Sequence, residues 1–189
     1  MRNIKNFFKQ YAAALNKSIL ELDVEKLDDA AREIIKTIKK KNTIYVCGNG
    51  GSAAIANHYI CDFLKFFRQR TKLKPKFVSL SNNLETITAI SNDIDYKYIF
   101  SYQAESLCEK NDLIIIISSS GNSKNVIELL KFAKKNKIKT IGFSGFRGGE
   151  LKKNCDISIH VKANNYGISE DSHHILMHVI LQYLIKEEE

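Results

Sequence analysis

The sequence predicts an α/β fold, a doubly wound five-stranded parallel sheet, and three observations lead to this prediction. Short apolar runs rich in β-branched residues alternate with helical stretches from residue 43 onward. The run Leu113–Ile117 is apolar on consecutive residues, which is typical of a strand covered on both faces. Helices between consecutive strands indicate right-handed crossovers. We therefore expect a flavodoxin-like, three-layer architecture with N-terminal helices and a long C-terminal helix.

The N-terminal segment, residues 1–40, has apolar residues at helical spacing. The pattern breaks near Leu22, which predicts two helices, with Asp23 as the N-cap of the second. We expect this segment to serve oligomerisation and residues 41–189 to form the α/β core of one domain.

The core alternates between the two element types. Its strands are predicted at residues 43–47, 77–80, 113–117, 140–143 and 157–161. Its helices are predicted near residues 52–67, 96–108, 123–135, 147–153 and 169–187. The last helix is apolar on nearly every side, so it must be buried all round, which a chain of this size achieves more easily in an oligomer.

Composition and charge exclude several classes of protein. The 189 residues include a single proline, 44% are hydrophobic and 26% are charged, which fits one packed domain and excludes a collagenous or disordered chain. No window approaches the roughly 18 consecutive apolar residues of a membrane span, and the N-terminus has no signal-peptide pattern. The four cysteines are widely spaced with no C-x-x-C pair, which favours a reducing compartment. We expect a cytoplasmic protein that binds no membrane.

The formal net charge of +8 favours anionic partners. Lysines occur on nearly every predicted helix rather than on one face with interleaved aromatic residues, so the pattern indicates a solvated basic surface and no nucleic-acid site. Such a surface also attracts phosphorylated metabolites.

A glycine-rich turn follows the first predicted strand and leads directly into a helix, at Gly48–Ala54. Glycines let the backbone approach a ligand closely, and the start of a helix presents free N–H groups to an anion. The spacing matches neither G-x-G-x-x-G nor a Walker A loop, so no nucleotide is expected. The alternative is a tight turn with no ligand.

A serine-rich turn, Ser118–Ser123, follows the middle strand and also precedes a helix. Its hydroxyl groups can donate hydrogen bonds to a phosphate without carrying charge. Both turns lie at carboxyl ends of strands in one sheet, so we expect them to converge on one crevice.

Four of the five histidines lie in two predicted helices. His58 and Asp62 stand four residues apart and so project from one helical face, as a metal site or an acid/base pair requires. The alternative is a surface polar pair. In the last helix Glu170, His174 and His178 recur every four residues, and His173 is displaced toward the neighbouring stripe.

At these positions the chain resembles the sugar isomerase (SIS) family, and in particular its sedoheptulose-7-phosphate, or phosphoheptose, isomerases. The resemblance rests on three motifs: C-G-N-G-G-S-A-A after the first strand, I-S-x-S-G-N-S after the middle strand and S-G-F-R-G-G-E after the next. It also includes N-D at residues 92–93, F-S-x-Q at residues 100–103 and the histidines of the last helix.

The resemblance implies a set of site residues. The residues expected to bind the substrate and its phosphate are Asn49, Gly50, Gly51, Ser52, Asn92, Asp93, Ser118, Ser119, Ser120, Ser123 and Glu170. Zinc-binding members carry H-x-x-x-E and Q-x7-H, which fall here on His58, Asp62, Glu170 and His178 as ligands of one Zn²⁺ per subunit. In that pattern the catalytic acid and base are Asp62 and His178. The resemblance also implies a homotetramer with active sites built between subunits.

Three residues depart from the family pattern. Asp62 replaces Glu and Glu170 replaces Gln, which keeps a plausible set of two imidazoles and two carboxylates. Phe66 stands where the isomerases carry an Arg, and Arg68 or Arg70 could reach back to replace it. Eight residues of unbroken helix separate Glu170 from His178 by about 12 Å, so either Glu170 precedes the helix or His174 is the partner of His178.

We therefore expect an aldose–ketose isomerase that works through an enediolate and needs no nucleotide or redox cofactor. The resemblance implies conversion of sedoheptulose 7-phosphate to D-glycero-D-manno-heptose 7-phosphate, toward the heptoses of lipopolysaccharide or capsule. The alternatives are isomerisation of another phosphosugar and a non-catalytic SIS module that binds a sugar phosphate or a protein partner such as a replication initiator.

Overall fold

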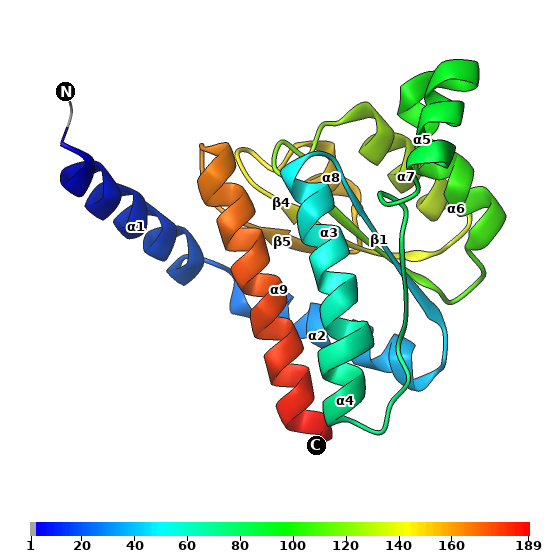
Figure 1. The fold of residues 1–189 in the computed structure, drawn as a ribbon, viewed down its shortest axis with the longest axis horizontal. Helices are drawn as coiled ribbons and strands as arrows, with labels where there is room; N and C mark the ends of the chain where they lie inside the picture. Colours follow the sequence, from blue (N-terminus) through cyan, green and yellow to red (C-terminus); the bar gives the residue numbers. More distant parts are fainter. Residues whose placement is uncertain (1–2) are drawn as a thin grey trace.

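The computed structural model describes residues 3–189, so the expectation for residues 1 and 2 lies outside the described part. Its centre is a five-stranded sheet in the order β2-β1-β3-β4-β5, with every neighbouring pair parallel (Figure 1). The strands are β1 (Thr43–Gly48), β2 (Lys76–Ser79), β3 (Leu113–Ser118), β4 (Lys139–Ser144) and β5 (Ile157–His160). All five predicted strands and the predicted fold class are confirmed.

Helices cover both faces of the sheet, because alternate residues of each strand point into two separate cores. On one face Ile115 and Ile117 pack with residues of α2 (Val24–Lys39), α3 (Gly51–Asp62) and α9 (Tyr166–Glu188). On the other face Ile114 and Ile116 pack with residues of α5 (Leu84–Ile90), α6 (Ser101–Leu107), α7 (Lys124–Lys135) and α8 (Gly149–Asn154). The isoleucines of β3 are thus buried on both sides, as the consecutive apolar run predicts.

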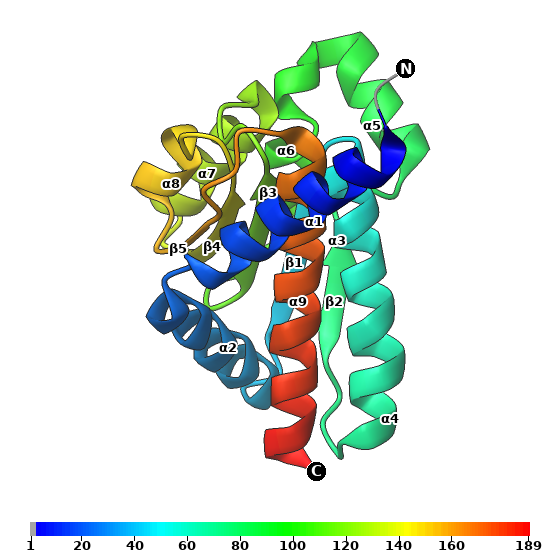
Figure 2. The same cartoon turned by 90° about the vertical axis from the view of Figure 1, so that its left-hand side faces the viewer.

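The N-terminal segment forms the two expected helices. Asp23 caps α2, because its side chain accepts a hydrogen bond from the backbone N–H of Glu25. The first helix, α1 (Ile4–Leu20), extends away from the body of the molecule (Figure 1) and crosses in front of α9 (Figure 2). The Tyr11 hydroxyl donates to Asp171 Oδ2 at 2.6 Å, which ties α1 to the first turns of α9.

The segment between β2 and β3 is more helical than expected. It contains α5, a π-helix η2 (Ser91–Asp95) and a 3₁₀ turn η3 (Tyr96–Tyr98) before α6, whereas the sequence predicted one helix from residue 96. Asn83 caps α5 by accepting from the N–H of Thr86. That N-cap was a readable signal, but seven residues give too little periodicity to reveal the helix.

The last helix and the helix after β1 lie side by side and run in the same direction in both views (Figures 1 and 2). Helix α3 continues as the π-helix η1 (Phe63–Phe67) and then as the short helix α4 (Arg68–Arg70). Helix α9 begins at Tyr166, so Glu170 belongs to it. Among residues 3–189, no helix has the length and apolar character needed to cross a membrane.

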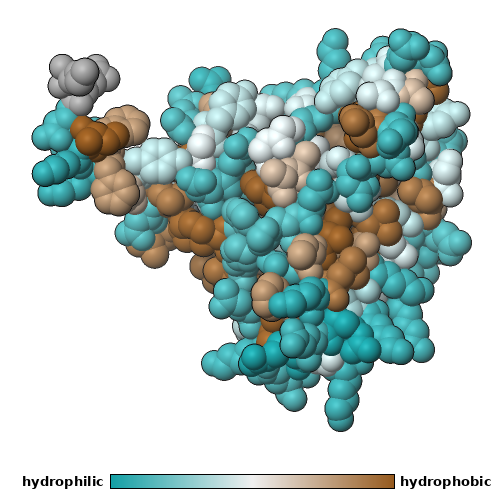
Figure 3. Space-filling model, in the orientation of Figure 1, coloured by the Kyte–Doolittle hydropathy of each residue, from teal (hydrophilic) through white to brown (hydrophobic). Residues whose placement is uncertain are grey.

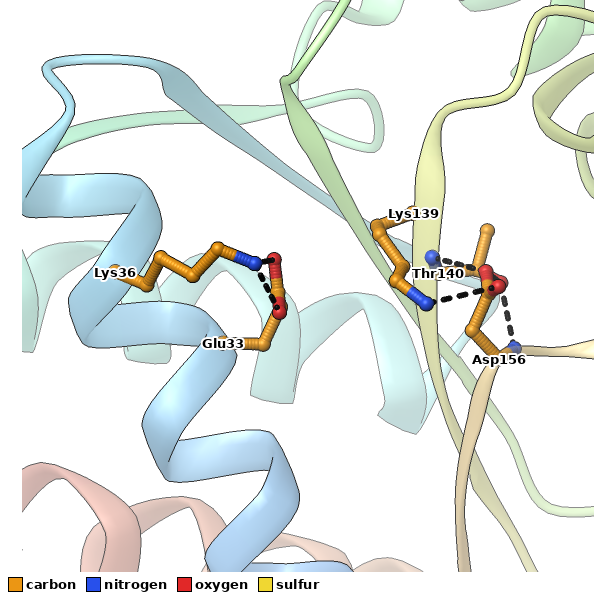
Figure 4. Close-up of polar contacts among 5 residues, drawn as sticks. All are labelled: Glu33, Lys36, Lys139, Thr140 and Asp156. Carbon is orange, nitrogen blue, oxygen red and sulfur yellow. Dashed lines mark hydrogen bonds and ion pairs between the residues drawn. The ribbon is translucent and has the colours of Figure 1, made fainter.

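Asp156 links the beginning of β5 to the beginning of β4 through hydrogen bonds (Figure 4). Its Oδ2 atom accepts hydrogen bonds from both the backbone N–H and the hydroxyl of Thr140, each at 2.8 Å, and Lys139 lies 3.3 Å from Oδ1. Although partial burial opposes ionisation, the hydrogen bonds from Thr140 outweigh it and lower the pKa of this carboxyl. The contact fixes the strand register at the end of the sheet opposite the serine-rich turn.

Candidate functional site

The glycine-rich and serine-rich turns meet beside the point where the strand order reverses. β1 and β3 are neighbours, with Gly48 opposite Ile117, and each strand is followed by a turn that leads into a helix, α3 after β1 and α7 after β3. In sheets of this order, ligands bind at this switch point, outside the carboxyl ends of the strands. The expected convergence of the two turns is therefore present.

The backbone of the glycine-rich turn requires glycine. Gly50, which precedes α3, has φ 54° and ψ −122°, a conformation that side chains disfavour. Ser52 is buried in the first turn of α3. The turn therefore directs the N-terminal end of α3, where N–H groups lack helical partners, toward the crevice.

The serine-rich turn presents hydroxyl groups with different local partners. Ser118 Oγ accepts from the N–H of Gly121, and Ser120 Oγ accepts from the N–H of Asn122, both at 3.2 Å. Ser119 Oγ is buried and finds no hydrogen-bond partner within residues 3–189. A buried hydroxyl without a partner is costly, so Ser119 is a candidate for a polar contact that the described residues do not supply.

A cluster of imidazoles around one carboxylate lies between α3 and α9. Asp62 Oδ2 lies 3.3 Å from His58 Nε2 and 3.2 Å from His178 Nε2, and these two nitrogens are 3.2 Å apart. His174 joins them, since one ligand atom from each of the three histidines lies within 4.8 Å of the others. We call His58, Asp62, His174 and His178 the histidine–aspartate cluster.

Burial shapes the electrostatics of this cluster. The Asp62 side chain is only 5% exposed, and a buried carboxylate needs polar partners, which the two imidazoles beside it provide. Burial, together with the neighbouring His178 and His58, lowers the pKa of His174. Its imidazole is therefore neutral at neutral pH, which is the form that binds metals. His174 Nε2 is buried with no partner among the described residues.

Comparisons with known proteins show the family of the chain. The SIS domain family model matches residues 7–145. A phosphoheptose isomerase of Aliarcobacter butzleri is 37% identical over 169 residues, which is 89% of each chain. The chain belongs to the phosphoheptose isomerase family of SIS domain proteins.

Solved structures of this family have the same fold. The phosphoheptose isomerase from Neisseria gonorrhoeae superimposes with a TM-score of 0.86 at 28% identity over 96% of each chain. The enzyme from Francisella tularensis gives 0.88 at 25% identity, covering 97% of this chain and 96% of the other. The family resemblance stated from the motifs is confirmed.

Glu170, at the glutamine position of the family pattern, lies one turn of α9 before the cluster. Its carboxylate packs against Gly51, where a side chain in place of the hydrogen would approach Glu170 Oε2 within 2.3 Å. Burial, and then the charge of Asp171, raise the pKa of Glu170. The carboxylate is therefore beside the glycine-rich turn, and the position nearest His58 and His178 on α9 is taken by His174.

His173 has a different role from its neighbour. It is fully buried and packs edge-on against Phe143, with 6.0 Å between ring centroids. Burial lowers its pKa to about 4, so it is a neutral residue of the core. His173 lies outside the four-residue repeat of His174 and His178 in the sequence, and this offset explains why it is buried in the core instead of joining the cluster.

Phe66, at the arginine position of the family pattern, lines a groove of about 660 Å³ that opens from the cluster between α3 and α9. Of the two arginines expected to compensate, Arg70 lines the same groove, where it forms an ion pair with Glu189. Gln69, Gln182 and Lys186 also line it. Sequence reasoning missed these three residues, which carry no motif.

Asn92 and Asp93 lie exposed on η2, where the Asn92 amide donates to Asp93 at 2.8 Å. Their segment returns to the glycine-rich turn through Tyr96, whose hydroxyl donates to Asn49 Oδ1 at 3.0 Å. Asn49 also pairs with Asn125. Tyr96 and Asn125 were not predicted as site residues, because nothing local in the sequence links them to a residue at least 47 positions away.

Proposed function

We propose that the chain is a phosphosugar aldose–ketose isomerase that converts sedoheptulose 7-phosphate to D-glycero-D-manno-heptose 7-phosphate. One observation supports this most strongly: α3 carries the glycine-rich turn at its start and, along its length, His58 and Asp62 of the histidine–aspartate cluster. From Gly51, seven residues to His58 and eleven to Asp62 correspond to about 10 and 17 Å along the axis. A seven-carbon open-chain sugar phosphate can therefore place its phosphate in the turns and its carbonyl near the cluster.

The proposed binding residues are those of the two turns. The backbone N–H groups at Gly50 and Gly51 and the hydroxyl groups of the Ser118–Ser123 turn bind the phosphate, whereas the Ser52 N–H already donates to the Asn49 carbonyl. The unpaired Ser119 hydroxyl supports this assignment. Fixing the phosphate orients an otherwise flexible sugar, which can lower the barrier by several kcal/mol in favourable cases. Asn92, Asp93 and Glu170 are proposed to bind the hydroxyl groups of the sugar.

Asp62 and His178 are the proposed acid and base. Isomerisation needs one group to take the proton from the carbon beside the carbonyl and another to serve the oxygens of the enediolate. Asp62 Oδ2 and His178 Nε2 are 3.2 Å apart, so both groups can serve the same end of a bound sugar, where one takes the carbon proton and returns it to the neighbouring carbon while the other exchanges protons with the oxygens. Both groups are on rigid helices, which holds them in place for the transfer.

The cluster also fits a zinc ion. Tetrahedral Zn²⁺ with bonds of about 2.0–2.1 Å to nitrogen and oxygen requires donors about 3.3 Å apart. The separations among Asp62 Oδ2, His58 Nε2 and His178 Nε2 are 3.2, 3.2 and 3.3 Å. Such an ion supplies Lewis-acid polarisation of the carbonyl and diol oxygens. Of the two sequence-based ligand sets, we favour the one with His174, because its buried Nε2 lacks a partner and Glu170 lies against Gly51.

We further propose that the enzyme is a homotetramer. Helix α1 exposes Ile4, Phe7 and Phe8, which are 73%, 56% and 69% exposed. Apolar atoms along α1 and the neighbouring surface are visible in Figure 3. A protruding helix with three large exposed apolar side chains favours association with other copies. Sedimentation equilibrium of the wild type and of Phe7→Ser/Phe8→Ser tests this, and a monomeric wild type contradicts it.

A substrate panel tests the proposed function. Zinc-loaded protein is incubated with sedoheptulose 7-phosphate, fructose 6-phosphate and unphosphorylated sedoheptulose, and the products are identified by NMR. We expect aldoheptose phosphate from the first compound only. Turnover of another phosphoketose alone contradicts the proposed substrate. Binding of sugar phosphate without turnover of any compound contradicts the isomerase and supports the non-catalytic module.

A further inference from the structure

The glycine-rich and serine-rich turns are joined by a reciprocal pair of side-chain amides. Asn49 Nδ2 donates to Asn125 Oδ1 and Asn125 Nδ2 donates to Asn49 Oδ1, both at 2.9 Å. Asn49 belongs to the glycine-rich turn, and Asn125 is the second residue of α7, directly after the serine-rich turn. Asn125 is 1% exposed, so this pair is shielded from water on that side.

The orientation of the pair is determined by its surroundings. Asn125 Oδ1 also accepts from the backbone N–H of Val126 at 2.9 Å, so a flipped amide would place its NH₂ against that donor. Asn49 Oδ1 accepts a second hydrogen bond from the Tyr96 hydroxyl at 3.0 Å. Both lone-pair positions of Asn49 Oδ1 are therefore used within the protein.

Tyr96 brings a third segment to this junction. It lies on η3, three residues after Asp93, at the end of the excursion that begins with α5. Tyr96 is 53% exposed, so little apolar packing holds it in place, and its hydroxyl makes the hydrogen bond to Asn49. The junction thus links three of the segments that carry the proposed substrate-binding residues; the fourth is α9, which carries Glu170.

We infer that Asn125 and Tyr96 are positioning residues: they act through Asn49 to hold the backbone N–H groups of the glycine-rich turn in register with the serine hydroxyls for a phosphate. This inference rests on the proposed function, because it assigns the anion of the substrate to these turns. The Asn49 carbonyl oxygen is thereby occupied, so its contribution to the site is the placement of its own turn. A preorganised anion site binds more tightly because less ordering is required on binding.

The test uses inorganic phosphate as a binding probe, measured by calorimetry, alongside KM and kcat for sedoheptulose 7-phosphate. The variants are Tyr96→Phe, which removes one hydroxyl, and Asn125→Ala. Tyr102→Phe is the matched control, since Tyr102 is similarly exposed, at 51%, and lies on the neighbouring helix α6. Losing a single neutral hydrogen bond corresponds to about two- to tenfold in binding.

We expect the phosphate Kd and KM to rise about fivefold in Tyr96→Phe and more than tenfold in Asn125→Ala, with kcat within about twofold. Tyr102→Phe should match the wild type. Asn49→Ala combined with Asn125→Ala should be little worse than either alone, because the two act as one unit.

Distinct results separate failure of the inference from failure of the proposed function. Unchanged phosphate affinity in both variants, with normal wild-type binding, overturns the inference and leaves the isomerase proposal intact. If the variants bind phosphate more weakly but the wild type turns over no phosphoketose, the inference is supported and the isomerase proposal is contradicted. A wild type that binds neither phosphate nor sugar phosphate overturns both.

Discussion

The Nε2 atoms of His58 and His178 lie 3.2 Å apart, although 120 positions separate the two residues in the chain. Asp62 Oδ2 lies within 3.3 Å of both nitrogens. The parallel packing of α3 and α9 creates this contact, because each helix repeats its inward-facing positions every three to four residues. Two short stretches of helix thus build the proposed reactive centre.

Removing the carboxylate of this centre should abolish most activity. We expect Asp62→Asn to lower kcat by about 10²–10⁴-fold, because the amide can neither accept nor return a proton. Steady-state kinetics with sedoheptulose 7-phosphate measures this. Asp28→Asn, which changes a half-exposed carboxylate on α2 that pairs with Arg32, is the control and should retain full activity. A loss below tenfold in Asp62→Asn contradicts its proposed role.

The choice between His174 and Glu170 as a zinc ligand can be made by metal content. We expect His174→Ala to lower zinc affinity by at least about 100-fold, more than the loss typical of a residue that only supports a ligand. Glu170→Gln should retain zinc, since that carboxylate packs against Gly51. Zinc competition titrations and the absorption spectrum of the Co²⁺ form are the readouts. Loss of zinc in Glu170→Gln with retention in His174→Ala reverses the assignment.

Ser119→Ala should have opposite effects on stability and on binding. The buried hydroxyl has no partner within the described chain, so its removal should raise the free energy of unfolding of the ligand-free protein by about 1 kcal/mol. The same change should raise KM several-fold if the hydroxyl binds phosphate. Thermal unfolding and kinetics measure the two effects. Ser158→Ala, which removes another buried hydroxyl at β5, should leave KM unchanged.

Asp156 predicts a pH dependence of stability. Its pKa is lower in the folded protein, so its stabilising contribution is present above the unfolded value of about 3.9 and is lost as pH falls through the folded value. We expect Asp156→Asn to cost about 1–2 kcal/mol at pH 7 and less at lower pH. Urea unfolding at pH 7, 5 and 3 measures this difference.

The matched control for Asp156 is Glu33→Gln. Glu33 pairs with Lys36 three residues later in α2 (Figure 4); the Glu33 side chain is 18% exposed and that of Lys36 52%, and a helical pair at this spacing contributes only about 0.5 kcal/mol or less. If Glu33→Gln lowers the free energy of unfolding at pH 7 as much as Asp156→Asn does, the Thr140 hydrogen bonds are not the source of the effect.

The fold was readable from the sequence because burial on both sides of a central strand dictates its composition. The run Leu113–Ile117 is fully buried, so every position in it favours an apolar residue. Helix α5 was missed because it is short and leaves Leu84 67% exposed, so it lacks a clear apolar stripe.

The site was readable only in part. The pair His58 and Asp62 follows from spacing within one helix, which backbone geometry fixes. Which turn of α9 faces that pair depends on how two helices pack, so the sequence left Glu170 and His174 as alternatives. The Asn49–Asn125 pair joins residues 76 positions apart, and no local pattern indicates it.

The central claim is that the turns hold the phosphate of an open-chain sugar while the histidine–aspartate cluster moves a proton at its carbonyl end. Incubation of zinc-loaded protein with sedoheptulose 7-phosphate in D₂O, followed by NMR, tests this most directly. We expect deuterium at the carbon beside the carbonyl and formation of aldoheptose phosphate with the wild type, and both at least about 100-fold slower with Asp62→Asn. The absence of both from the wild type, or equal exchange in Asp62→Asn, contradicts the claim.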